Sequence, residues 1–87
     1  MNSLSIIKAH QYLYYVKYAP IWSDFEYDTF CNKHEIFGGG GSDCEEDYAP
    51  EIKDLADIMY DFQEYFRPSK CADDMISEYK VLTSYEG

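Results

Sequence analysis

The chain has 87 residues, 46% of them hydrophobic, and its seventeen acidic and seven basic residues give a net charge of −10. This length predicts one small domain with a limited core and leaves no room for the separate domains of a large enzyme. Because so acidic a surface repels phosphates, we expect no direct binding to nucleic acid and a basic protein as the natural partner.

Two helices joined by a short turn are predicted in the first part of the chain. Apolar and aromatic residues recur at helical spacing over about residues 3–18. Pro20 ends this helix. Ser23, followed three residues later by Glu26, forms a capping box that starts a second helix over about 24–35. The residues that this second helix buries are Phe30 and Cys31 together with Phe25 or Tyr27.

The second part of the chain predicts a linker and two further amphipathic helices. The four glycines and the acids after them indicate a flexible linker over 38–48. Apolar residues then recur at spacings of three and four over about 50–66, and a fourth helix is expected over about 70–82. The prediction is a single all-α domain, 1–87, with a helical hairpin in 1–37 and an acidic helical pair in 49–87.

An acidic ridge is predicted on the outer face of the third helix. Residues 43–87 carry thirteen acidic and four basic residues, which is −9 of the net charge. Four of these acids step by three or four residues and would line up over about 15 Å of helix. Such a row is either a solvated outer face or a surface that mimics a phosphate backbone and docks on a basic protein. Its members are Asp54, Asp57, Asp61 and Glu64.

Neither a metal site nor a membrane span is indicated. Cys31, Cys44 and Cys71 are an odd number without Cys-x-x-Cys spacing, and with His10 and His34 they form no zinc signature. We therefore expect free thiols and no metal. No apolar run approaches 18 residues, and no basic start precedes an apolar stretch, so we expect a cytoplasmic protein of a bacterial or virus-infected cell.

The stretch from His10 to Phe30 carries a spaced pattern of Tyr-Tyr, a Pro-containing turn and then Ser-Asp-x-Glu-Tyr-Asp. Over roughly residues 4–35 it resembles the N-terminal Ia subdomain of bacterial NAD-dependent DNA ligases. The resemblance implies a helical pair that closes over the nicotinamide mononucleotide half of NAD. The chain departs from the family pattern at Tyr18 and Trp22. The ligand-binding residues that the resemblance implies are Tyr14, Tyr15, Asp24, Tyr27 and Asp28.

The residue types suit that ligand on physical grounds. A pyridinium ring is flat and cationic, so tyrosine faces attract it by about 0.5 to 2 kcal/mol each. Carboxylates accept charge-assisted hydrogen bonds from ribose hydroxyls. The alternative is that the tyrosines are amphipathic core residues with hydroxyls at the surface, and that Asp24 and Glu26 only favour a helix start.

The chain lacks what a complete ligase needs. Adenylation requires a lysine in a Lys-x-Asp-Gly context, and the nearest string is Lys53-Asp54. We therefore expect no catalytic activity from this chain alone. One hypothesis is a module that binds nicotinamide mononucleotide and acts in trans with, or on, a ligase or another NAD-using nucleic-acid enzyme. The other is a small acidic inhibitor or DNA mimic, of the kind that viruses and phages encode, which binds a basic surface of a nucleic-acid-processing protein.

Overall fold

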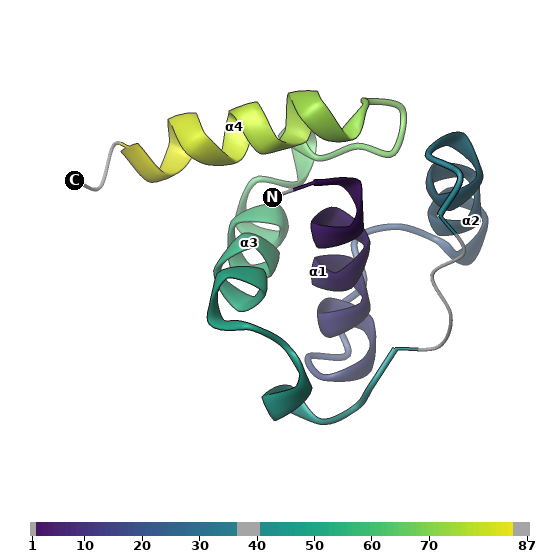
Figure 1. Ribbon diagram of the computed structural model, residues 1–87, viewed down its shortest axis with the longest axis vertical. Coiled ribbons are helices and arrows are strands. Elements are labelled where there is room, and N and C mark those ends of the chain that lie inside the picture. The colour runs from purple at the N-terminus through teal and green to yellow at the C-terminus, as the bar shows by residue number, and fades with distance from the viewer. Residues whose placement is uncertain (1, 37–40, 85–87) are drawn as a thin grey trace.

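The computed structural model describes residues 2–36 and 41–84, and these residues form four α-helices, two short 3-10 helices and no strand (Figure 1). The predicted all-α class is therefore confirmed. Gly38, Gly39 and Gly40 of the predicted linker lie outside the described residues. The elements in chain order are α1 (Ser3–Tyr15), α2 (Asp24–Lys33), η1 (Glu45–Asp47), α3 (Pro50–Asp61), η2 (Gln63–Tyr65) and α4 (Ala72–Ser84).

Capping boxes start the first two helices. At α1 the Asn2 side chain accepts a hydrogen bond from the Ser5 backbone N–H, and the Ser5 hydroxyl accepts one from the Asn2 N–H. At α2, Ser23 and Glu26 make the same reciprocal pair, at 3.1 and 3.0 Å. The capping box predicted from the sequence is confirmed. Each box satisfies two backbone donors that a helix start otherwise leaves unpaired.

Both N-terminal helices end in the left-handed backbone region, earlier than predicted. Tyr18 has φ 54° beyond α1, and Glu35 has φ 56° beyond α2. After α2 the Ile36 N–H donates to the Cys31 carbonyl and the Glu35 N–H to the Asn32 carbonyl, which is a Schellman motif. A residue other than glycine seldom adopts this conformation, so the hydrophobic pattern gave no sign of where these helices stop.

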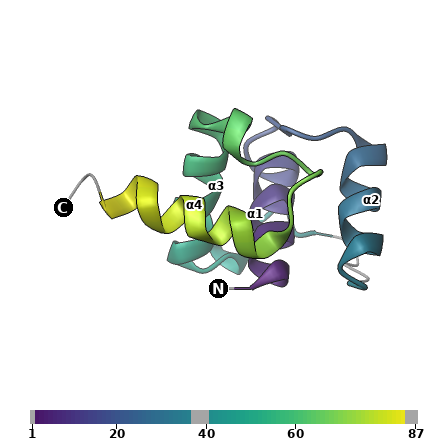
Figure 2. The ribbon, with the colours of Figure 1, turned by 90° about the horizontal axis from the view of Figure 1, so that it is seen from above.

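Helix α1 lies at the centre of the fold. It packs chiefly against α3, α4 crosses both, and α2 stands apart on the far side of α1 (Figures 1 and 2). Side chains from all four helices and from the segment after η2 meet in one buried core. The largest fully buried side chains are Phe30, Phe66, Ile6, Ile7, Leu13, Leu55, Met59 and Met75.

The helix predicted over about 50–66 is interrupted. Helix α3 begins with Pro50 at its first turn, as expected, but ends at Asp61, and η2 follows after Phe62. The break lets the chain turn while Phe66 remains fully buried. Periodicity alone missed the break because Phe62 and Phe66 continue the apolar spacing of the helix.

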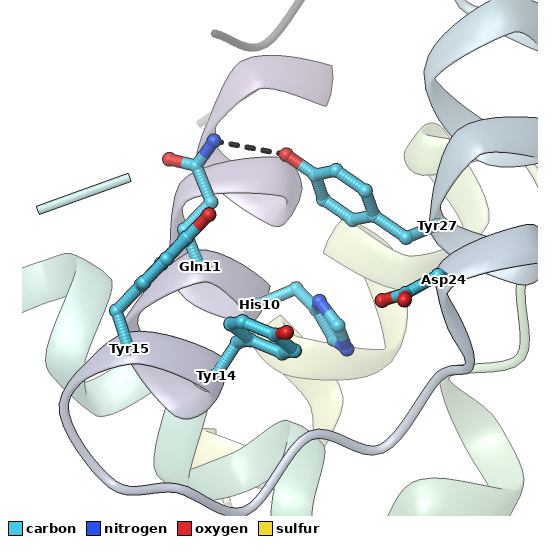
Figure 3. Close-up of a pocket in the computed structure, with 6 residues that line it drawn as sticks. All are labelled: His10, Gln11, Tyr14, Tyr15, Asp24 and Tyr27. Carbon is cyan, nitrogen blue, oxygen red and sulfur yellow. Dashed lines mark hydrogen bonds between the residues drawn. The ribbon is translucent and has the colours of Figure 1, made fainter. Parts of the chain in front are cut away.

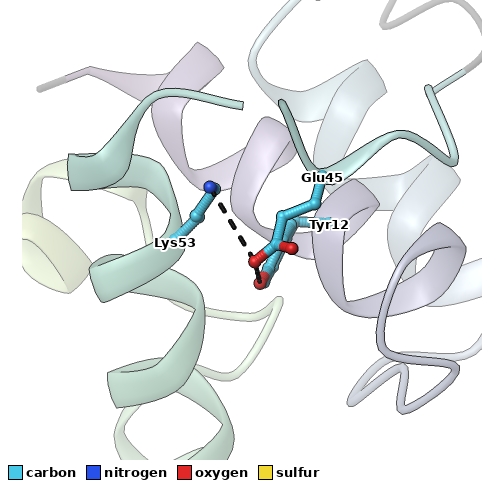
Figure 4. A network of polar contacts seen from close by, with 3 residues as sticks. All are labelled: Tyr12, Glu45 and Lys53. Carbon is cyan, nitrogen blue, oxygen red and sulfur yellow. Dashed lines mark hydrogen bonds and ion pairs between the residues drawn. The ribbon is translucent and has the colours of Figure 1, made fainter. Parts of the chain in front are cut away.

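Residues 41–48 of the predicted linker include a short 3-10 helix and a buried anchor. Tyr48 is buried, packs edge-on against Tyr12 of α1, and exchanges hydrogen bonds with the backbone of Ser42. Glu45 of η1 accepts a hydrogen bond from the Tyr12 hydroxyl at 3.4 Å and pairs with Lys53 of α3 at 3.8 Å (Figure 4). This segment is therefore fastened to both α1 and α3.

Two histidines join α2 and its flanking residues to the rest of the molecule. His10 of α1 accepts the Trp22 backbone N–H at 3.1 Å. His34, just after α2, accepts the Ala72 N–H at the start of α4, also at 3.1 Å. No helix within the described residues has the length and apolar character to cross a membrane.

Candidate ligand pocket between α1 and α2

A pocket of about 110 Å³ opens where α2 stands off from α1, and its walls come from both helices (Figure 3). Four of the five residues implied by the ligase resemblance line it: Tyr14 and Tyr15 from α1, and Asp24 and Tyr27 from α2. The structure thus brings together side chains up to thirteen positions apart. Asp28 does not line the pocket and is exposed.

Tyr14 and Tyr15 form one wall with their rings edge-to-face, the centroids 4.8 Å apart. Tyr14 is 43% exposed, so it is not a core residue. Both also line a second, wider and more open hollow, together with Tyr18, Pro20 and Asp43.

The backbone at Gly41 packs closely against the Tyr15 ring. A Cβ atom added at Gly41 would lie 2.5 Å from Cδ2 of Tyr15 and 3.0 Å from Cβ of Gln11. Only glycine lets the backbone come this close to the ring. The end of the predicted linker therefore helps to set where the Tyr15 wall stands.

His10 forms the floor of the pocket, and only 3% of it is exposed. Its ring is stacked between Trp22 and Tyr27, with centroids 4.9 and 5.4 Å away. Because Nε2 accepts the Trp22 N–H, the neutral ring carries its proton on Nδ1. Burial lowers the pKa of His10 to about 4, although the nearby carboxylates of Asp24 and Glu26 act against the shift. The imidazole is therefore neutral at physiological pH.

Gln11 and Tyr27 join the two walls. The Gln11 Nε2 group donates a hydrogen bond to the Tyr27 hydroxyl at 2.9 Å (Figure 3). Burial raises the pKa of Tyr27 to about 12, so its hydroxyl remains protonated. The ring of Tyr27 is held in place by this bond and by the His10 stack, which leaves a preformed aromatic wall.

Sequence reasoning missed His10 and Gln11 as pocket residues. They precede Tyr14 and Tyr15 by four positions, and residues four apart share one face of a helix. That spacing was the signal that could have found them. Trp22, where the chain departs from the ligase pattern, is buried, and its indole N–H donates to the Phe66 carbonyl at 2.8 Å.

The four predicted partner-binding acids do not share one environment. Asp57 and Asp61 border an open hollow with Lys17, which follows α1. Asp54 lies close enough to α4 to contribute, after burial, to the raised pKa of Tyr79. Glu64 lies beyond α3, in η2. All four acids are exposed.

The pocket has the size of a single ring. Pockets for drug-sized ligands usually measure about 300 to 1,000 Å³, so a volume of about 110 Å³ admits a single six-membered ring. Tyrosine faces and the Asp24 carboxylate suit a cationic ring. No lysine or arginine lines the pocket or the neighbouring hollow among the described residues.

Comparison with protein-family models, curated proteins and solved structures finds no match for this chain. The three cysteines are free. Within residues 2–36 and 41–84 no group of three or more histidine, cysteine or carboxylate side chains is placed to hold a metal ion.

Proposed function

We propose that this protein is a non-catalytic module that binds the nicotinamide mononucleotide part of NAD through the pocket between α1 and α2. The observation that carries the proposal is the convergence of Tyr14, Tyr15, Asp24 and Tyr27 on one ring-sized pocket. If these tyrosines only packed in the core, they would not surround a hollow, and Tyr14 would not be 43% exposed.

The nicotinamide ring would enter between the tyrosine walls. Stacking and cation-π attraction to two or three tyrosine faces would provide most of the affinity, at about 0.5 to 2 kcal/mol for each contact. Because the pocket has room for the ring only, the ribose and phosphate would extend beyond it, where Asp24 is the nearest carboxylate on the pocket wall to accept a ribose hydroxyl.

The direct test is calorimetric titration of the purified protein with nicotinamide mononucleotide and with NAD. Tyr14→Ala should weaken binding at least about tenfold, the equivalent of one lost contact of about 1.4 kcal/mol. Tyr60→Ala is the matched control, because Tyr60 is similarly exposed, at 47%, and lies on α3 away from the pocket. Absence of saturable heat up to millimolar ligand would refute the proposal.

The resemblance suggests that the module works with a ligase. The test adds this protein to a bacterial NAD-dependent DNA ligase from which the Ia subdomain has been deleted, and follows adenylation of the ligase lysine. Restored adenylation that is lost with Tyr14→Ala would support action in trans. If the protein instead lowers the activity of an intact ligase, it competes with the resident subdomain.

A second candidate function rests on the acids of α3. Asp54, Asp57 and Asp61 are exposed, and the one ion pair within the described residues joins Lys53 to Glu45. This unpaired surface suits docking on a basic protein, as an inhibitor or DNA mimic would do. Binding to the intact ligase should then fall steeply with salt and respond to Asp57→Lys and Asp61→Lys, with Asp73→Lys on α4 as the control. A salt-insensitive complex would count against it.

A further inference from the structure

The floor of the pocket presents a hydrogen-bond donor that the fold does not use. The only hydrogen bond of the His10 ring within the described part of the chain is the one that Nε2 accepts from the Trp22 backbone N–H. Nδ1–H therefore has no partner there. No side-chain nitrogen or oxygen among the described residues is both fully buried and unpaired, so Nδ1 is not fully enclosed. The His10 ring lines the pocket, which is the space we assign to this donor. A buried donor in this position favours a ligand with an acceptor atom at the inner end of the pocket.

The charges around the pocket are all of one sign. Asp24 lines it, and both Asp24 and Glu26 act electrostatically on the His10 ring. Among the described residues no cation lines the pocket, and Asp43 borders the neighbouring hollow. This environment attracts a positive ring but repels a negative substituent on that ring.

We propose that the pocket selects its pyridinium ligand by the charge of the ring substituent. It accepts a carboxamide, whose oxygen accepts a hydrogen bond from His10 Nδ1–H, and it rejects a carboxylate. The inference rests on the proposed function and makes His10 and Asp24 the specificity-determining residues. A carboxamide oxygen is a neutral acceptor and satisfies the donor without adding charge. A carboxylate would also accept a hydrogen bond from Nδ1–H, but it would place a second negative charge close to Asp24.

Two small ligands separate these cases without ribose or phosphate. 1-Methylnicotinamide and 1-methylnicotinate have nearly the same size and shape, and they differ in whether a carboxamide or a carboxylate sits on the cationic ring. We expect calorimetry at low salt to show that the carboxamide binds at least about tenfold more tightly, because the carboxylate is repelled by Asp24. Equal affinities would overturn the inference and leave the proposed function standing. Failure of both ligands and of nicotinamide mononucleotide to bind would overturn both.

Asp24→Asn tests the source of the discrimination. The substitution keeps the shape and removes the charge, so the preference for 1-methylnicotinamide should shrink to about threefold or less, as expected if most of a tenfold ratio is electrostatic. Asp28→Asn is the matched control, since Asp28 is an exposed carboxylate on the same helix that does not line the pocket. A preference that survives Asp24→Asn, or falls equally in Asp28→Asn, would show that the Asp24 charge does not discriminate.

The donor role of His10 can be measured without replacing the residue, which also holds the Trp22 N–H. Nitrogen-edited NMR of the histidine ring reports the Nδ1–H proton directly. We expect 1-methylnicotinamide to slow the exchange of this proton with water at least about tenfold, whereas 1-methylpyridinium, which lacks the carboxamide, should leave it unchanged. An identical response to the two ligands would overturn the assignment of His10.

Discussion

The indole N–H of Trp22 donates a hydrogen bond to the backbone carbonyl of Phe66, 2.8 Å away, and so connects the segment before α2 to the segment after η2. Both residues are buried. Trp22→Phe removes the donor and leaves a buried carbonyl unpaired, which should lower the free energy of unfolding by about 1 to 3 kcal/mol. Urea denaturation measures the change. Phe25→Leu is the control, because Phe25 is 79% exposed and its replacement should change stability by less than about 0.5 kcal/mol.

The histidine on the pocket floor should make the fold sensitive to mild acid. In the unfolded chain the His10 pKa is near 6.5, whereas burial lowers it to about 4 in the folded protein. Above pH 6.5 the ring is neutral in both states. Between pH 6.5 and 4 the unfolded chain binds a proton that the folded chain does not, so the free energy of unfolding falls with falling pH.

The expected loss from His10 is about 2 kcal/mol between pH 7 and pH 5. Urea denaturation at these two pH values measures the total change, and an NMR titration of the His10 ring isolates its part. A folded-state His10 pKa of 6 or higher would contradict the prediction, because the loss would then be about 0.5 kcal/mol or less.

Gly41→Ala should disturb the pocket more than the fold. The added Cβ would meet the Tyr15 ring at 2.5 Å, so the ring must move. We expect the affinity for nicotinamide mononucleotide to drop about three- to tenfold, with a loss of stability of about 1 kcal/mol or less. The control is the same substitution in a Tyr15→Ala background, where no ring remains to be displaced. A Gly41→Ala effect of equal size in both backgrounds would exclude this contact as the cause.

The Tyr48 hydroxyl anchors the segment before α3. It donates to the Ser42 carbonyl at 2.7 Å and accepts the Ser42 N–H at 3.0 Å. Tyr48→Phe removes both bonds, so the free energy of unfolding should fall by about 1 to 2 kcal/mol in thermal or urea denaturation. Tyr60→Phe, at an exposed position on α3, should have no measurable effect. Equal stability of the two variants would mean that the segment is not held through Tyr48.

The helices were predictable where local chemistry determines them. The Ser23 and Glu26 capping box and Pro50 mark helix starts in the sequence itself. The helix ends were not, because Tyr18 and Glu35 adopt left-handed conformations that their residue types disfavour. The anchoring of residues 41–48 depends on contacts from Tyr48 to Tyr12, far apart in the chain, which no local pattern reports.

The candidate site was predictable in part, because helical spacing determines which side chains share a helix face. The aromatic and acidic positions of the ligase-like pattern fall on helix faces that meet, so four of them could be anticipated. Asp28 lies four positions after Asp24 and so shares its side of α2, yet it is exposed and does not line the pocket. Helical spacing could therefore not have separated Asp28 from the residues that do line it. The role of His10 depends on Trp22, whose backbone N–H fixes the tautomer, and that contact exists only in the folded chain.

The two histidine bridges also have a dynamic consequence. Helix α2 stands apart from the other helices (Figures 1 and 2). Just before it, the Trp22 N–H donates to His10 of α1, and just after it, His34 accepts the Ala72 N–H of α4. We expect a helix held in this way to open as a local unit, so that its amides exchange hydrogen with solvent sooner than those of the central α1. Because Tyr27 and Asp24 belong to α2, a ligand ring bound between α1 and α2 would slow the exchange of the α2 amides. The hydrogen-exchange rate of the α2 amides would then report whether the pocket is occupied.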